Sequence, residues 1–393
     1  MKAAVVNSFA SAPQFQDFAD PVAAEGEIVV EMLAVGLHPV VKSLASGKHY
    51  SSNAQPPLIP GVDGVARLED GSIHYCYAAH PPYGTLAQRT LITRSSSIPL
   101  PPGLDPAHAA AIANPGMSAW LALKLRGGLS AGETVLVNGA TGVAGQLAVQ
   151  AARYQGASRV IATGRNADVL AGLGSDATIL LTEPEDAVRQ AFTEQVAGGI
   201  DLIIDYLWGR PTELLLEALG TAFRREGSKR MRLVEVGESA GRTIALPGAI
   251  LRGIDLTLCG SGFGSARMSE IFAAIPTLFN LAAEGHLKVA VEIVPLEQVE
   301  EAWAGSKKER GLSFRYRNKA RLTPGVAWFF PGHREHFRVL PVSIQVAQQK
   351  KRAAKDAKAP PTALIWRART CRRTPPWEIS PVRSRSIPKR QLS

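Results

Sequence analysis

The stretch "ETVLVNGATGVAGQLAVQAARYQG", residues 133–156, decides the fold, because it predicts a strand, a tight turn and a helix in direct succession. Its first part, residues 134–137, is a short apolar run of the kind found in a buried parallel strand. Gly139, Gly142 and Gly145 then recur at every third residue, and a helical pattern begins near Val143. A glycine turn between a strand and a helix is typical of an α/β domain.

The residues after this unit alternate between short apolar runs and helical patterns. This alternation predicts a doubly wound parallel sheet of the Rossmann type over residues 118–285. A helix is expected over residues 266–284, kinked at Pro276 and ended by Gly285. The strands are expected at residues 134–138, 159–163, 178–181, 201–205, 232–236 and 255–259.

A second, smaller domain is predicted before the sheet. Residues 1–117 are rich in glycine and proline and contain few helical patterns, which favours a β domain. After the sheet, residues 286–316 predict one strand and one helix that return to this β domain. Short strand-like pieces of the first domain lie near residues 3–6, 27–34, 64–68 and 86–93.

Length and composition agree with a globular protein of about two domains. The chain has 393 residues, of which 46% are hydrophobic, enough for a large core. It contains no run of apolar residues long enough to span a membrane, so we expect a cytoplasmic protein without a membrane partner. Cys76, Cys259 and Cys371 are too far apart to predict a metal knuckle and too few for a disulfide framework.

The basic charge belongs to one end of the chain. Residues 317–393 hold 18 Lys and Arg but only 3 Asp and Glu, which leaves 26 basic and 31 acidic residues, a net charge of −5, before them. This Pro-rich, basic tail lacks a sustained apolar period, so we expect it to be disordered. A polyelectrolyte arm that binds RNA or DNA phosphates is the alternative, although no nucleic-acid-binding motif accompanies it.

The glycine turn predicts a dinucleotide site. In a Rossmann unit the first glycine permits the tight turn, the second lets the backbone approach a pyrophosphate, and the third lets helix and strand pack closely. The helix that follows directs its unpaired N–H groups at the phosphates. The alternative is a glycine turn that serves helix–strand packing and binds nothing.

The end of the second strand indicates which dinucleotide. NAD sites usually place Asp or Glu there, to bind the ribose 2′-hydroxyl, whereas this sequence has Gly164, Arg165 and Asn166. A guanidinium holds a 2′-phosphate through paired charge-assisted hydrogen bonds. The sequence therefore predicts NADP(H), with Arg165 as its main determinant, and a solvated arginine without a ligand is the alternative.

The order of these parts resembles the medium-chain dehydrogenase/reductase superfamily, and within it the zinc-independent quinone oxidoreductases of the zeta-crystallin type. The segments that carry the resemblance are "AVGLHPVVKSLASGKHY" (34–50), "IPGVDGVARLEDG" (59–71) and "GLSAGETVLVNGATGVAGQLAVQAA" (128–152). "IDLIIDYLWG" and "LRGIDLTLCGSGFG" continue it, so that it spans about residues 1–316. The resemblance implies a GroES-like catalytic domain, a Rossmann domain and a homodimer formed by edge pairing of the nucleotide-binding sheets.

The resemblance also implies site residues. Tyr50 matches the family's active-site tyrosine, and Lys42 and His38 lie on the segment that faces the family's cleft. The cofactor contacts implied by the glycine turn, the second strand and the later strand ends are Gly139, Thr141, Gly142, Val143, Gly145, Gly164, Arg165, Asn166, Tyr206, Gly237, Ser261 and Gly262. All of them follow the carboxyl ends of predicted strands, where open α/β sheets bind ligands.

The sequence departs from the zinc enzymes of the superfamily. His38 and then Val62-Asp63 stand where those enzymes have zinc ligands, and the cluster of four cysteines is missing. His38, Asp63 and Cys76 offer N, O and S donors, but at a spacing that matches no zinc pattern. We therefore expect no metal, and His38 also replaces an asparagine of the zinc-free group.

Without a metal, the expected reaction is hydride transfer from NADPH to a quinone or an α,β-unsaturated carbonyl compound. An enoyl-thioester reductase and a non-catalytic NADPH-binding or sensor protein remain as alternatives. A short-chain reductase does not fit, because those chains place the glycine loop near the N-terminus and need a Tyr-x-x-x-Lys pair. No tyrosine in this sequence has a lysine four residues after it.

Overall fold

The computed structural model describes residues 1–9, 11–49, 52, 54–77, 79–221, 230–305 and 310–315. All of them belong to one compact unit, Met1–Leu322. The basic tail, residues 317–393, lies outside the described residues, so its predicted disorder and its nucleic-acid alternative stay predictions. Among the helices of the described ranges, none has the length and apolar character needed to cross a bilayer.

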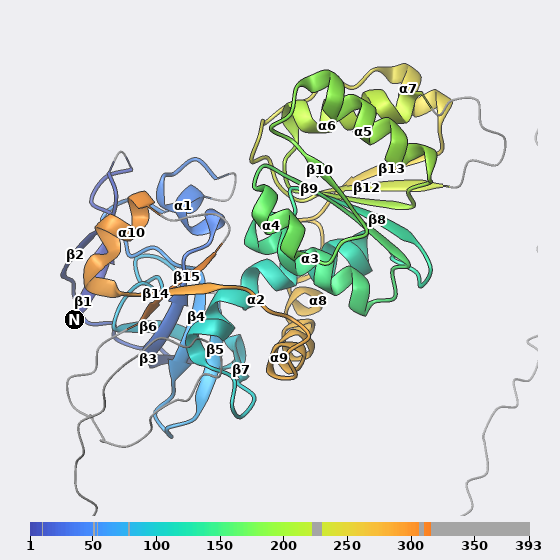
Figure 1. The fold of residues 1–393 in the computed structure, drawn as a ribbon. Helices are drawn as coiled ribbons and strands as arrows, with labels where there is room; N and C mark the ends of the chain where they lie inside the picture. The colour runs from blue at the N-terminus through green and yellow to red at the C-terminus, as the bar shows by residue number, and fades with distance from the viewer. Residues whose placement is uncertain are drawn as a thin grey trace, which may run out of the picture. The chain divides into compact units, whose positions relative to one another are not determined.

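A six-stranded parallel sheet is the centre of one lobe (Figure 1). The strand order is β10-β9-β8-β11-β12-β13, so the chain starts in the middle of the sheet, builds to one edge and then to the other. This is the Rossmann order, and it confirms the predicted fold class. The strands are β8 (Thr134–Asn138), β9 (Arg159–Gly164), β10 (Ala177–Leu180), β11 (Leu202–Asp205), β12 (Met231–Glu235) and β13 (Leu256–Gly260).

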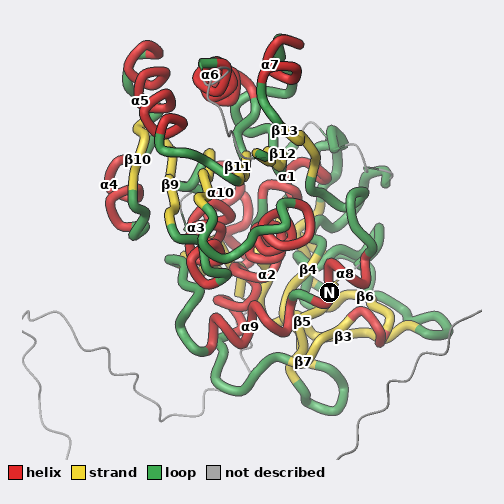
Figure 2. The backbone as a smooth tube through the Cα atoms, turned by 90° about the vertical axis from the view of Figure 1, so that its right-hand side faces the viewer, coloured by secondary structure: helices red, strands yellow, loops and turns green. Residues whose placement is uncertain are grey.

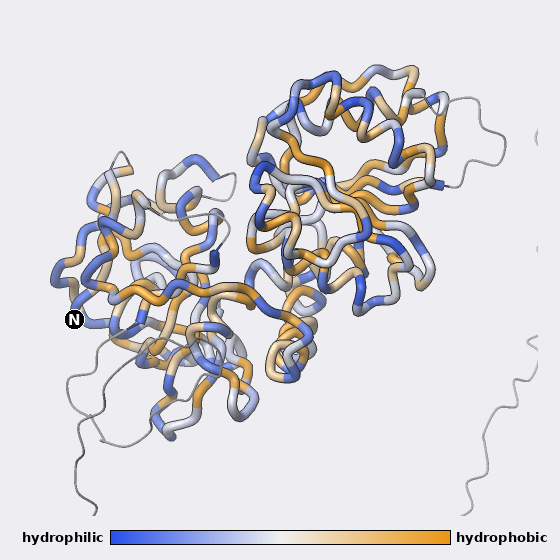
Figure 3. The backbone as a smooth tube through the Cα atoms, in the orientation of Figure 1, coloured by the Kyte–Doolittle hydropathy of each residue, from blue (hydrophilic) through white to orange (hydrophobic). Residues whose placement is uncertain are grey.

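Helices cover both faces of this sheet because its central strands are apolar on both sides. Leu136 and Ile203 pack against the helices α5 (Glu185–Ala197) and α6 (Gly209–Gly220). Val135 and Val137 pack on the opposite face against α3 (Val143–Tyr154). Figure 2 shows α5, α6 and α7 (Gly248–Gly253) on one side of the strands, and Figure 3 shows these strands as largely hydrophobic.

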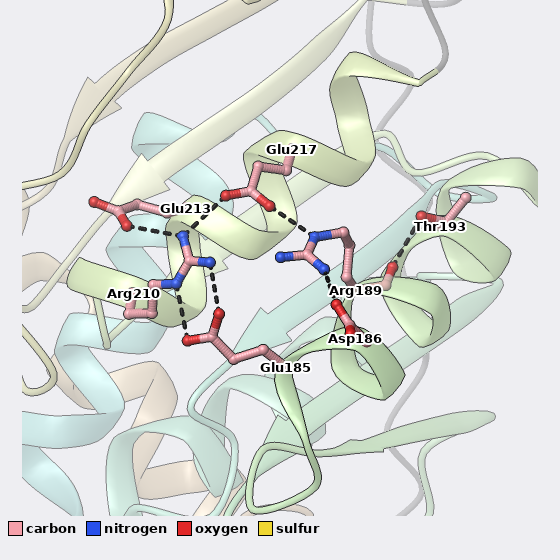
Figure 4. A network of polar contacts seen from close by, with 7 residues as sticks. All are labelled: Glu185, Asp186, Arg189, Thr193, Arg210, Glu213 and Glu217. Carbon is pink, nitrogen blue, oxygen red and sulfur yellow. Dashed lines mark hydrogen bonds and ion pairs between the residues drawn. The ribbon is translucent and has the colours of Figure 1, made fainter.

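Ion pairs join the outer surfaces of α5 and α6 (Figure 4). Arg210 of α6 contacts Glu185, Glu213 and Glu217 at 2.6, 3.2 and 2.9 Å. Arg189 of α5 reaches Glu217 at 2.8 Å, so one carboxylate binds both arginines. These side chains are 22–56% exposed, and ion pairs near the surface contribute little individually to stability.

The second lobe contains a seven-stranded sheet of early and late segments of the chain. Its order is β14-β15-β3-β4-β5-β7, with β6 paired to β3. The late strands β14 and β15 pair with each other, and β15 pairs with β3, so both belong to this sheet. The elements are β3 (Glu27–Gly36), α1 (Pro39–Ala45), β4 (Asp63–Arg67), β5 (Ile73–Tyr77), β6 (Arg89–Thr93), β7 (Ser97–Pro99), β14 (Val291–Pro295), α10 (Val299–Gly305) and β15 (Gly311–Arg315), beside the hairpin of β1 (Lys2–Val5) and β2 (Gln14–Asp17).

The helix expected over residues 266–284 is two helices. α8 (Met268–Ala273) stops at Ala274, and α9 (Ile275–Ala283) starts with Pro276 in its first turn. Proline lacks the N–H group that a continuous helix needs, so the predicted kink is a break. Gly285 follows the end of α9 with a φ of +79°, as expected of a glycine after a helix C-cap.

Helix α2 (Pro106–Leu121) connects the two lobes. It contacts β3, β4 and β15 of the β lobe as well as α3 and α9. Its inward side chains are mainly alanines, which let neighbouring backbones approach closely. One hydrophobic cluster therefore runs from Ala34 and Tyr75 through α2 to Val135 and Phe279.

Candidate active site

A cleft of about 1850 Å³ receives residues from both lobes. The C-terminal edge of the parallel sheet supplies one wall, and α1 with the residues around it supplies the other. All of the site residues predicted from the sequence line this cleft, with the exception of Tyr50, which lies outside the described residues.

The glycine turn depends on one left-handed backbone conformation and one close approach of the backbone. Gly139 has a φ of +94°, a conformation that side chains other than glycine rarely adopt. A Cβ on Gly145 would lie 2.3 Å from the carbonyl oxygen of Gly139, so helix α3 crosses the end of β8 at the closest possible distance. Gly142 is the N-cap of α3 and has no side chain to satisfy the first N–H groups, which therefore remain available to a ligand.

Arg165 stands beside this turn, at the end of β9. Its side chain is exposed and makes no hydrogen bond or ion pair with any residue that the structure describes. Gly164 next to it passes close to Thr141, because a Cβ there would lie 2.3 Å from Thr141 Cγ2. Asn166 Oδ1 accepts a hydrogen bond from the Val169 N–H at 3.1 Å, so this oxygen caps α4 (Ala167–Gly172).

A buried polar row lies directly under the turn. Thr163 donates to Asn138 Oδ1 at 2.7 Å and accepts from the Gly139 N–H at 3.1 Å, while Asn138 Nδ2 donates to Asp205 at 3.0 Å. Asp205 also accepts from the N–H groups of Leu207 and Trp208. Burial raises the pKa of Asp205, while these hydrogen bonds and that from Thr212 act in the opposite direction. The row thus ties the glycine turn to the loop after β11.

The loops after β11, β12 and β13 contribute the remaining predicted contacts. Tyr206 has a buried hydroxyl near Ser118 of α2, and burial raises its pKa. The Gly237 N–H donates to Asp205 O at 3.2 Å, and the Ser261 N–H donates to Glu235 O at 2.7 Å. The Gly262 N–H is engaged by Ser265 Oγ at 2.8 Å.

Arg126 is a site residue that the sequence did not predict. It ends the π-helical turn Ala122–Arg126 after α2 and lines the cleft. Its Nε donates to Gly260 O at 2.8 Å and its Nη1 donates to Ser265 O at 3.3 Å, so it fixes the loop after β13. The two segments are more than 130 residues apart in sequence, and no local motif links them.

On the opposite wall, His38 faces a buried carboxylate. His38 is 6% exposed and Asp63 is 3% exposed, and Nε2 of His38 lies 3.7 Å from Oδ1 of Asp63. Neither atom has a hydrogen bond of ordinary geometry among the described residues, although the nearby Ala110 carbonyl acts to raise the pKa of His38. The other carboxylate oxygen, Asp63 Oδ2, accepts a hydrogen bond from Tyr75 at 2.7 Å. Burial lowers the pKa of His38 and raises that of Asp63, so burial favours the neutral form of each.

Lys42 also lines the cleft, but its ammonium group is engaged. Lys42 Nζ donates to Trp303 O of α10 at 2.5 Å and lies 5.6 Å from the centre of the Trp303 indole. Lys42 thus connects α1 to the returning segment of the chain.

Cys76 is separated from His38 and Asp63 by the sheet. Its neighbour Tyr75 packs in the core cluster under α2, whereas Cys76 packs in the cluster on the other face. Burial raises the pKa of its thiol to about 12, which keeps it protonated. In the described ranges no three His, Cys, Asp or Glu side chains come together as a metal site; a reaction without zinc stays a prediction.

Comparisons with known proteins follow the same lines as the geometry. No protein-family model matches the chain. A probable NADPH-dependent quinone reductase of Emericella nidulans is 29% identical over 347 residues, covering 77% of this chain and 96% of that protein. Prostaglandin reductase-3 of Mus musculus is 27% identical over 295 residues, covering 70% of this chain and 74% of the other. The quinone oxidoreductase of Thermus thermophilus, solved also in complex with NADPH, is 26% identical with a TM-score of 0.67 and covers 80% of this chain and all of its own.

A GroES-like lobe joined to a Rossmann lobe, with a cleft at the ends of the parallel strands, defines the medium-chain dehydrogenase/reductase class. Within this class the chain is similar to proteins named as quinone oxidoreductases, the group that its sequence motifs resemble.

Proposed function

We propose that this protein is an NADPH-dependent reductase that transfers a hydride to a quinone or an α,β-unsaturated carbonyl compound. The observation that carries the proposal is the cleft itself, because the glycine turn and Arg165 line one side of it and the titratable side chains of His38 and Lys42 line the other. The names of the relatives from Emericella nidulans and Thermus thermophilus support the same chemistry.

The described residues fit a bound NADPH. The N–H groups at the start of α3, brought close to β8 by Gly145, suit the pyrophosphate. Arg165 forms no ion pair with a described residue and supplies a cation where the 2′-phosphate is expected. Its neighbours Gly164 and Asn166 carry no negative charge. Tyr206, Gly237, Ser261 and Gly262 would then line the path toward the nicotinamide.

When bound, NADPH supplies the hydride, and the chain must position the acceptor and balance the charge that develops on its oxygen. His38 and Lys42 are the proposed sources of charge stabilisation on the cleft wall. Tyr50 is the proposed group that orients the carbonyl or passes a proton, carried over from the family because it lies outside the described residues.

We further propose a homodimer that pairs the sheets through strand β13. This strand is an edge of the parallel sheet, since among the described strands only β12 is bonded to it. Leu258 on β13 is 38% exposed and Leu251 on the adjacent α7 is 48% exposed, and an open apolar edge favours pairing with another strand. The predicted cytoplasmic location is part of the same proposal and awaits localisation of the protein.

The test is an assay of NADPH oxidation with a panel of quinones, enones and enoyl thioesters. We expect turnover with quinones or enones, and a larger thermal stabilisation by NADPH than by NADH. Turnover confined to enoyl thioesters would replace the acceptor class that we propose. Stabilisation by NADPH without any turnover would indicate a binding or sensor protein instead.

A further inference from the structure

The buried pair of His38 and Asp63 is built from more elements than the packing of the cleft wall requires. Three elements converge on it: His38 follows β3 and precedes α1, Asp63 opens β4, and Tyr75 belongs to β5. All three side chains are at least nine-tenths buried. A buried carboxylate costs several kcal/mol unless it is paired, so this arrangement needs a reason.

The space for the histidine ring is built into the sheet. A Cβ on Gly36 would lie 2.4 Å from His38 Nε2 and 2.5 Å from the carbonyl oxygen of Ala110. Glycine at this position therefore lets Nε2 turn inward, toward Asp63 and α2. His38 also lines the cleft, and its Nε2 is buried on the side of Asp63.

The carboxylate is held from behind. Tyr75 donates to Asp63 Oδ2, and its ring packs edge-on against Phe279 of α9 at 5.5 Å. Burial raises the pKa of Tyr75 far above its usual range, so the phenol remains a donor. Tyr77 and Cys76 are the other titratable groups that act on Tyr75. Both are neutral at pH 7, and burial raises their pKa values further.

We propose that His38 and Asp63 together hold one proton and that His38 delivers it to the acceptor, with Asp63 and Tyr75 as positioning residues. This inference rests on the proposed function. Without its proton the pair would leave an unpaired carboxylate in the core, so it stays loaded at neutral pH. A movement of about 1 Å brings the 3.7 Å separation to hydrogen-bond distance.

Addition of the hydride converts the acceptor to an enolate or hydroquinone anion, with the negative charge on oxygen. One N–H bond of His38 breaks and one O–H bond forms on the acceptor, while the O–H bond of Asp63 breaks and an N–H bond forms at Nε2, so that the ring ends neutral. The pair changes from neutral to a charge of −1, which remains on Asp63, where the Tyr75 hydroxyl stabilises it. Solvent restores the proton after the product leaves.

The kinetic test compares His38→Asn, Asp63→Asn and the double variant, with quinone and NADPH, across pH. For the wild type we expect kcat to fall as the pH rises through the pKa of the pair. Each single variant should lose about 100-fold in kcat and keep its KM for NADPH. It should also lose the fall of kcat at high pH, which is the high-pH limb of the profile. The double variant should be no slower than the singles, because Asp63 acts through His38. Multiplied losses, or an unchanged limb in His38→Asn, would overturn the proposal.

Two further variants and a control complete the kinetic test. Tyr75→Phe removes only a hydroxyl, so the limb should move to higher pH, because the carboxylate loses a donor. Tyr50→Phe should leave the limb in place, and its disappearance there would transfer the proton role to Tyr50. The matched control is the pair of His80 and Glu27, 2.8 Å apart in the same lobe and 53% and 17% exposed. His80→Asn and Glu27→Gln should stay within twofold of wild type.

A measurement without turnover separates this inference from the proposed function. In the cofactor-free protein, the NMR resonance of the histidine ring that is lost in His38→Asn should titrate with the midpoint of the kinetic limb. Tyr75→Phe should raise that midpoint, and this arm also serves if Asp63→Asn does not fold. If the wild type reduces no acceptor, the proposed function fails while the NMR titration still decides whether the pair holds a proton. A ring that stays neutral and does not respond to Tyr75→Phe would refute the pair.

Discussion

Replacing Gly145 by alanine tests whether helix α3 must touch the end of strand β8. The added Cβ would lie 2.3 Å from Gly139 O, 2.6 Å from Ala140 Cα and 2.9 Å from Ala140 C. All three atoms belong to the backbone, so no side chain can rotate away. Ordinary contacts between such atoms need about 3.5 Å, and the helix start must therefore move by about 1 Å.

The expected cost follows from this overlap. Overpacking in a core costs about 1–3 kcal/mol, and contacts with backbone alone place Gly145→Ala at the upper end. The better helix propensity of alanine returns about 0.5–1 kcal/mol. We therefore expect a net loss of about 2 kcal/mol, which corresponds to about 4–8 °C in melting temperature for a domain of this size. Affinity for NADPH should fall at least about tenfold, since the displaced N–H groups are those that suit the pyrophosphate.

Urea unfolding and calorimetric titration with NADPH measure both effects. The matched control is Gly172→Ala in the exposed last position of α4, where a Cβ would have no atom within 4 Å. That variant should gain about 0.5–1 kcal/mol and bind NADPH as the wild type does. An unchanged urea midpoint together with unchanged NADPH affinity in Gly145→Ala would refute the close approach.

Three further predictions concern single side chains. Arg165→Ala should weaken NADPH binding about 10- to 100-fold in calorimetry, the value of one or two charge-assisted hydrogen bonds, and leave NADH binding unchanged. The control is Arg230→Ala, which replaces an exposed arginine bonded to Thr257 and should change the binding of neither coenzyme. Equal losses for both coenzymes in Arg165→Ala would contradict the assignment. Arg210→Ala should lower the urea midpoint slightly at low salt and not at about 1 M salt, because its carboxylate partners lie at the surface, 22–56% exposed. A salt-independent loss would point to packing instead. In the native protein at about pH 8, iodoacetamide should label Cys259 and spare Cys76, because burial raises the pKa of the Cys76 thiol to about 12. Peptide mass spectrometry measures the labelling of each thiol. Equal labelling of the two would mean that Cys76 is accessible.

The nucleotide-binding lobe was predictable because its information is local. Apolar runs of four or five residues, glycine turns and alternating helices identified all six strands of the parallel sheet to within a few residues. The break between α8 and α9 was less exact, since a proline in a helical pattern predicts a disturbance and not its extent. The helix α1 escaped notice because it is short and its β-branched residues favour strands.

The cleft could be predicted only in part, because much of it depends on contacts that are remote in sequence. Gly139, Gly145 and Arg165 belong to a motif with fixed spacing, whereas Arg126 meets Ser265 only through the fold. The partnership of His38 with Asp63 likewise requires the register of β3 with β4. The binding roles of these residues stay predictions, and so do the domain boundaries, one of which falls inside α2 at residue 117.

Helix α2 has a consequence for anyone who would recombine or shorten this chain. Since one continuous hydrophobic core runs from Ala34 to Phe279 by way of this helix, neither lobe contains a complete hydrophobic core by itself. A chimaera that takes its catalytic half from one reductase and its coenzyme half from another should fold only if α2 matches both. Fragments divided at residue 117 should be insoluble alone and rescue each other when expressed together.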